Sequence, residues 1–207
     1  MSVLPRSLFW ERRDTTGAEH TLVDARTGLH ARGTALAVDP IAYTARYDIR
    51  TDPSWVTTSI EVTAEGGGWS RTLRMEADGG RWRVTTAEQG DLDAALTAAG
   101  HAGAGLAGTE DPDLLVGAYD VDLTGSPLTN TLPIRRLGLD KAEPGVAHRV
   151  SVVWVLLPSL EVIQADQIYT ALGDGRVRFA NETFNADLRV DDDGFVLEYP
   201  GLAQRRP

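Results

Sequence analysis

Short segments that alternate apolar and polar side chains recur at even spacing along the first part of the chain. Each segment is bounded by glycine, aspartate or proline, and a period of two is typical of half-buried β-strands. Strands joined by such short turns pair with their sequence neighbours in antiparallel fashion. The pattern predicts a meander over Ser7–Arg13, Glu19–Asp24, Leu29–Val38, Ile41–Arg50, Trp55–Ala64, Trp69–Ala77 and Arg81–Thr86.

A second series of strand-like segments follows in the C-terminal part. Its first member, His148–Leu157, is nearly all apolar, which is typical of a strand buried on both faces. The tail from Ala203 to Pro207 is expected to fray, as chain ends commonly do. We expect one mainly β domain over residues 1–207, in which the second meander continues through Glu161–Leu172, Arg176–Ala180, Thr183–Val190 and Phe195–Tyr199.

The segment from residue 87 to residue 117 interrupts the strand pattern. Eleven of the fifteen residues from Ala94 to Gly108 are alanine or glycine, which leaves little side chain to bury. Asp91 can cap two turns of helix that reach Ala99. We interpret the segment as a mobile surface excursion, and a lid over a ligand site is the alternative because long loops are often functional.

Charge and composition exclude several classes of partner. The 207 residues contain thirty acidic and twenty basic side chains, and the net charge of −10 opposes binding to nucleic acid. Without cysteine, the chain has no thiol chemistry and no thiolate metal site. The first residues lack an apolar run long enough for a signal peptide, and no segment approaches the ~20 apolar residues of a membrane span. A cytoplasmic protein is expected.

Chemistry concentrates between Tyr119 and Leu137, in the sequence YDVDLTGSPLTNTLPIRRL. Asp120 and Asp122 flank one residue, so a strand would place both carboxylates on one face. A short helix is predicted over Leu128–Leu137, because Thr129 or Asn130 can cap its start, Pro133 is tolerated in a first turn and Gly138 supplies a stop. Arg135 and Arg136 would lie near the end of this helix, where its dipole favours cations.

Two interpretations of the paired aspartates and arginines remain open. An ion-pair network that ties a turn to the sheet is favoured, and acid–base catalysis on a small anionic substrate through Asp120 or Asp122, with Arg135 or Arg136 holding the anion, is the alternative. The four histidines show no metal-binding or catalytic spacing, and no phosphate loop or serine-nucleophile motif occurs. We therefore expect no metal, no cofactor and no catalytic residue.

Aromatic residues gather in the second meander. Trp154, Tyr169 and Phe184 would line an apolar cavity if these strands curl around a space, and ordinary core packing is the alternative.

The stretch from Tyr119 to Leu137, above all DVDL followed by PLTNTLPIRRL, resembles the signature of the bacterial "Putative glycolipid-binding" family. The resemblance extends from Phe9-Trp10-Glu11-Arg12 to Tyr199-Pro200-Gly201-Leu202 and leaves out about Ala87–Leu115. It implies a spiral β-roll, a strongly curved antiparallel sheet of many strands wrapped around one short helix, with a distant likeness in fold to periplasmic lipoprotein carriers.

The resemblance implies a non-enzymatic carrier or sensor of a lipid-like or glycolipid-like molecule. Its ligand would lie on the concave side of the roll. A homodimer formed through an exposed sheet edge is the further alternative. The residues expected to contact a ligand are Asp120, Asp122, Asn130, Arg135, Arg136, Trp154, Tyr169 and Phe184.

Overall fold

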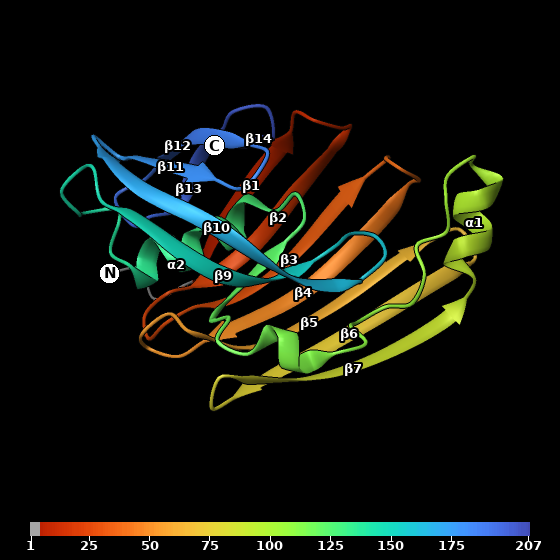
Figure 1. The fold of residues 1–207 in the computed structure, drawn as a ribbon. Helices are drawn as coiled ribbons and strands as arrows, with labels where there is room; N and C mark the ends of the chain where they lie inside the picture. Colours follow the sequence, from red (N-terminus) through yellow and green to blue (C-terminus); the bar gives the residue numbers. More distant parts are fainter. Residues whose placement is uncertain (1–4) are drawn as a thin grey trace.

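The structure is a computed structural model and describes residues 5–207. Within these residues, two meanders join into one 14-stranded sheet (Figure 1). The first meander comprises β1 (Arg6–Arg12), β2 (Gly17–Asp24), β3 (His30–Ala37), β4 (Tyr43–Thr51), β5 (Thr57–Gly66), β6 (Trp69–Asp78) and β7 (Arg81–Gly90). The second comprises β8 (Asp120–Leu123), β9 (Ala147–Val155), β10 (Val162–Gly173), β11 (Arg176–Ala180), β12 (Asn185–Val190), β13 (Val196–Tyr199) and β14 (Ala203–Arg206).

The last strand, β14, joins the two meanders. It pairs with β1 on one side and with β13 on the other, both in antiparallel fashion. The prediction of a frayed tail is therefore wrong for Ala203–Arg206. Only four residues form this strand, which is too short for a clear alternating pattern, and its partner β1 lies nearly two hundred residues away in the sequence.

The sheet is strongly curved but not closed, because β7 forms one edge and β8 the other. Figure 1 shows β9 and β10 crossing over the strands of the first meander, with the helix α2 (Pro127–Arg136) between the two layers. A single cluster of buried residues includes Trp10 and Ile60 from the first meander, Leu132 from α2 and Val153 from β9. The predicted β-roll around a short helix is confirmed.

One pair of strands departs from the antiparallel pattern. β8 pairs with β9 in parallel, with Asp120 opposite Val152 and Asp122 opposite Trp154. The chain runs from the end of β8 through α2 and then enters β9 in the same direction as β8. A crossover connection of this kind allows two strands to pair in parallel. The second half of β9 is buried on both faces, since Val152 and Val153 are both almost inaccessible, whereas Arg149 near its start is exposed.

The helix α2 begins and ends within one residue of its predicted limits. It is buried all round from Pro127 to Ile134, because sheet strands enclose it. Pro133 lies in the helix interior and not in the first turn, so that part of the prediction is wrong. The end follows the prediction: Gly138 adopts a φ of 66°, and Leu139 N donates to Ile134 O at 2.9 Å, which forms a Schellman motif.

The excursion is more ordered than its composition suggests. β7 continues to Gly90, the helix α1 (Leu92–Ala98) follows with Asp91 as its N-cap, and the 3-10 helix η1 (Pro112–Leu115) precedes β8. Three leucines, Leu92, Leu96 and Leu115, supply buried side chains that the alanine and glycine residues lack.

Backbone hydrogen bonds anchor the middle of the excursion. Gly108 N donates to Leu160 O, and Val162 N donates to Gly108 O, both at 2.7 Å. The buried Arg71 of β6 donates to Ser159 O at 3.0 Å and lies 3.9 Å from the Asp93 carboxylate of α1. These contacts tie the segment to β6 and to the turn between β9 and β10.

Candidate ligand-binding cleft

A cleft opens where β8 meets the start of α2. Its volume is about 180 Å³. Polar side chains come from the β8–α2 segment and β10, and aromatic rings come from the second meander. The residues that line it are Asp122, Thr124, Gly125, Ser126, Asn130, Trp154, Ala165, Asp166, Gln167, Phe179, Asn181, Phe184, Tyr199 and Leu202.

The polar side of the cleft is a hydrogen-bonded network. Asp122 accepts from Thr129 Oγ1 at 3.0 Å through Oδ1 and from Gln167 Nε2 at 2.6 Å through Oδ2. Asn130 Nδ2 donates to Tyr169 Oη at 2.9 Å, and Tyr169 Oη donates to Gln167 Oε1 at 3.0 Å. Because each side chain is held by a neighbour, the network fixes the polar groups before any ligand arrives.

The apolar side of the cleft is a group of aromatic rings. Phe179 lies 6.3 Å from Phe184 and 6.0 Å from Tyr199, measured between ring centroids. Phe184 is 45% exposed, although large aromatic side chains are usually buried. Trp154 lines the same cleft from β9, directly beside Asp122 in the sheet register.

The two aspartates of the DVDL strand share a face but have different neighbours. Asp120 is fully buried and accepts from Arg136 Nη2 at 2.6 Å and from Arg136 Nε at 3.1 Å. Burial raises the pKa of Asp120, and the Arg136 guanidinium opposes part of that rise. Asp120 and Arg136 form the predicted ion pair between strand and helix. Neither Asp120 nor Arg136 lines the cleft.

Arg135 also lies away from the cleft. Its Nη1 donates to Asp193 O at 3.0 Å, and its guanidinium lies 4.9 Å from the centroid of the Trp55 ring. The structure therefore brings together four of the predicted contact residues, Asp122, Asn130, Trp154 and Phe184. Tyr169 lies behind them, bonded to Asn130.

Glu19 is a buried residue that the sequence did not single out. The side chain is 1% exposed and projects from β2 towards the start of α2. Glu19 Oε1 accepts from Tyr47 Oη and, at 2.6 Å, from Ser126 Oγ, while Oε2 has no partner within the described residues. Ser126 occupies the N-cap position of α2 without a capping hydrogen bond from its side chain, and it also lines the cleft. The predicted N-cap residues, Thr129 and Asn130, lie inside the helix, which begins at Pro127, so that part of the prediction is wrong.

Burial raises the pKa of Glu19 from 4.5 to about 7, although Ser126, Tyr47 and Arg12 favour its ionised form. A carboxyl group whose folded pKa exceeds its unfolded pKa lowers stability as the pH rises between the two values. For Glu19, the unfolding free energy begins to fall near pH 4.5 and stops falling above about pH 7, and the total loss is about 3 kcal/mol.

Glu19→Gln is expected to remove this pH dependence, because the amide oxygen still accepts both hydrogen bonds without a charge. We expect the variant to gain up to about 3 kcal/mol of unfolding free energy over wild type at pH 8 and almost nothing at pH 4. Urea denaturation across this range measures the gain. Glu61→Gln, at an exposed glutamate, is the control. If the unfolding free energy of Glu19→Gln differed from that of wild type by the same amount at pH 4 and pH 8, the raised pKa of Glu19 would be refuted.

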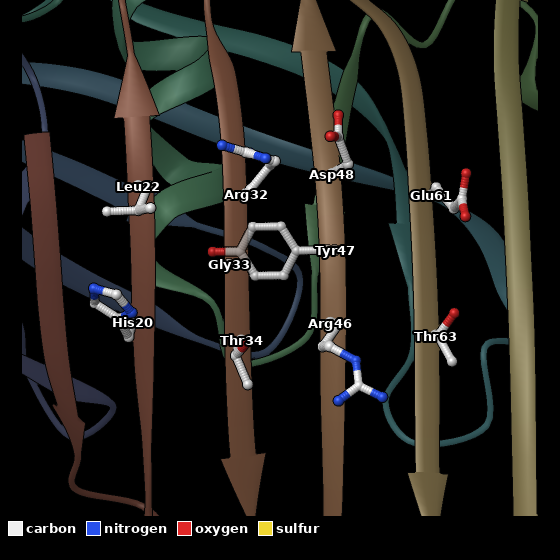
Figure 2. Close-up of a pocket in the computed structure, with 10 residues that line it drawn as sticks. All are labelled: His20, Leu22, Arg32, Gly33, Thr34, Arg46, Tyr47, Asp48, Glu61 and Thr63. Atoms are coloured by element: carbon white, nitrogen blue, oxygen red, sulfur yellow. The ribbon is translucent and has the colours of Figure 1, made fainter. Parts of the chain in front are cut away.

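A larger groove lies on the outer face of the first meander (Figure 2). Its volume is about 580 Å³, and it crosses β2 to β5 above Gly33, where a Cβ would lie 2.2 Å from the Tyr47 ring. Arg46 is paired with Glu65, and Asp48 with His30. We favour the smaller cleft because it combines aromatic rings with buried polar groups, as ligand sites usually do.

Two further structural tests concern metals and membranes. Among residues 5–207, no group of three or more histidine, aspartate or glutamate side chains could hold a metal ion. Within the same range, no helix has the length and apolar character needed to cross a bilayer.

Comparisons with known proteins agree with the resemblance seen in the sequence. The profile of a family described as "Putative glycolipid-binding" matches residues 7–205. A crystal structure of a DUF1089 family protein from Pseudomonas aeruginosa superposes with a TM-score of 0.69 at 27% sequence identity, over 91% of this chain and 92% of that one. No match was found among curated proteins. The chain belongs to the "Putative glycolipid-binding" family.

Proposed function

We propose that this protein binds a glycolipid-like amphiphile in the cleft, as a non-enzymatic carrier or sensor. The observation that supports the proposal is the division of the cleft into a fixed polar side and an exposed aromatic side. Sugar hydroxyl groups can donate to Asp122 and exchange hydrogen bonds with Asn130 and Gln167. The rings of Trp154 and Phe184 offer apolar faces to a sugar ring or to the first carbons of a tail.

The size of the cleft favours recognition of a head group over enclosure of an acyl chain. Its volume of about 180 Å³ is below the ~300–1,000 Å³ of pockets that enclose a drug-sized ligand. The space between the two layers of the roll holds buried side chains such as Leu123, Leu128 and Leu132. A tail would therefore leave the cleft over Phe184 and Leu202, and not pass through the roll.

The alternative of an enzyme that holds an anionic substrate through Arg135 or Arg136 receives no support from this geometry. Arg136 is bound by Asp120, and Arg135 is turned towards Asp193 and Trp55. Among the described residues, no basic side chain lines the cleft. An anionic head group would instead meet the carboxylates of Asp122 and Asp166.

Calorimetry with octyl glucoside, below its micelle concentration, tests the proposal. We expect saturable binding that is stronger than that of glucose or octyl sulfate, because the first lacks the tail and the second replaces the sugar by an anion. Trp154→Leu and Phe184→Ser should each weaken binding about tenfold, since each removes an aromatic face worth about 1–2 kcal/mol.

Phe9→Ser is the matched control, because Phe9 is 41% exposed but lies on β1 outside the cleft. The control should bind octyl glucoside as wild type does. Absence of saturable binding to wild type, or an equal loss in the Phe9 variant, would count against the cleft as the ligand site.

Two further parts of the proposal concern the location and the oligomeric state of the protein. We propose a cytoplasmic location and, through the exposed edge strand β7, a homodimer. Cell fractionation would test the location, and light scattering would test the dimer.

A further inference from the structure

We propose that the cleft selects an amphiphile whose head group carries a protonated amine, an inference that rests on the proposed function. The neutral glycoside then serves as a probe of the site, and an aminated sugar or a similar ammonium head group is the preferred ligand.

The first support is the charge balance around Asp122. Two other aspartates that are buried or partly buried have guanidinium partners: Asp120 has Arg136, and Asp191 has Arg6 and Arg205. Asp122 has only the neutral donors Thr129 and Gln167, and it forms no ion pair within the described part of the chain. A bound ammonium group would supply the missing counter-charge.

The second support is that Asp122 can still accept hydrogen bonds. An ionised carboxylate offers about four acceptor positions, and Thr129 and Gln167 occupy one on each oxygen. Asp122 is only partly buried and is one of the residues that line the cleft. A head group in the cleft can therefore reach a carboxylate oxygen directly.

The third support is the aromatic wall. Trp154, Phe179, Phe184 and Tyr199 line the same cleft as Asp122. The faces of such rings carry partial negative charge and attract cations within about 6 Å of the ring centre. Rings and carboxylate together form an environment in which an ammonium group is better compensated than a hydroxyl group or an anion.

The charged and titratable groups around Asp122 do not replace the missing cation. Tyr169 of β10 and Tyr199 of β13 lie close enough to feel its charge, and Asp120 on the same strand is already neutralised by Arg136. Asp166 at the rim is paired with Arg149 at 2.6 Å. Burial raises the pKa of Asp122, and the hydrogen bonds from Gln167 and Thr129 offset only part of that rise.

A pair of isosteric ligands tests the inference. Octyl 6-amino-6-deoxyglucoside differs from octyl glucoside by one ammonium group in place of a hydroxyl group, and its primary amine is protonated at about pH 7.5. We expect wild type to bind the amine at least about tenfold more tightly than the neutral glycoside, a difference of about 1.4 kcal/mol. Asp122→Asn should bring the two affinities within about twofold of each other.

The control variant is Asp187→Asn, which removes a carboxylate that has an arginine partner, Arg178, and lies outside the cleft, so it should keep the preference. The comparison in wild type needs no variant, so a folding defect in Asp122→Asn leaves the main test intact. Equal binding of the two glycosides by wild type overturns this inference alone, as does a preference that survives in folded Asp122→Asn. If neither glycoside binds, the proposed function and the inference both fail.

Discussion

Replacing Arg136 by methionine is expected to lower the unfolding free energy by about 3–5 kcal/mol. Arg136 is the only ion-pair partner of Asp120 within residues 5–207, and Asp120 is fully buried between β9 and α2. Methionine retains most of the apolar stem but leaves the carboxylate unpaired in a site that water does not reach. The variant must either bury an uncompensated charge or protonate Asp120. Urea denaturation at neutral pH measures the loss.

Two controls separate the buried pair from an ordinary surface contact. Arg178→Met breaks an ion pair with Asp187 whose side chains are 51% and 40% exposed, and it should cost less than about 1 kcal/mol. The double variant Asp120→Asn with Arg136→Met should recover part of the stability, because no charge remains buried. A cost for Arg136→Met as small as that for Arg178→Met would show that the pair is not buried in solution.

Removing Ala203–Pro207 is expected to abolish cooperative folding. These residues include β14, whose loss exposes the backbone edges of β1 and β13 in the middle of the sheet. The deletion also removes the ion pair of Arg205 with Asp191 at 2.8 Å. The loss of stability is larger than that from removing one contact, because the two meanders are joined through β14. Circular dichroism during thermal unfolding should show no sharp transition.

Deleting Pro207 alone is the control, because this residue follows β14 and forms no part of it. That variant should unfold like wild type. A cooperative transition at the wild-type temperature after removal of Ala203–Pro207 would mean that the tail does fray in solution and that the meanders are held together in another way.

The elements that were predicted well are those that depend on local pattern. Six of the seven strands of the first meander lie within two residues of their predicted limits, because alternating burial, hydrogen bonding and turn residues act over a few positions. The seventh, β7, begins at its predicted residue but runs four residues past Thr86. The end of α2 was predicted for the same reason, since a glycine with positive φ at position 138 is a local requirement. The parallel β8–β9 pair and the role of β14 depend on distant segments.

The candidate site was predicted in part, and helix geometry explains the error. Arg135 and Arg136 are adjacent in α2, so their side chains point about 100° apart. Only Arg136 reaches Asp120, while Arg135 meets the turn before β13. Gln167 could have been found from the alternation of β10, which places it on the same buried face as Tyr169. Glu19 gave no such signal, because its partners Tyr47 and Ser126 come from distant parts of the chain.

The sequence by itself determined the β class, the limits of most strands, the short helix and the presence of acidic and aromatic residues at its flanks. These features follow from side-chain period and turn chemistry, which act between near neighbours. Only the tertiary structure decided which aspartate is neutralised and which one faces a cleft. The curvature of the sheet brings β8, α2, β9 and β10 together, and that curvature depends on packing between residues far apart in the chain.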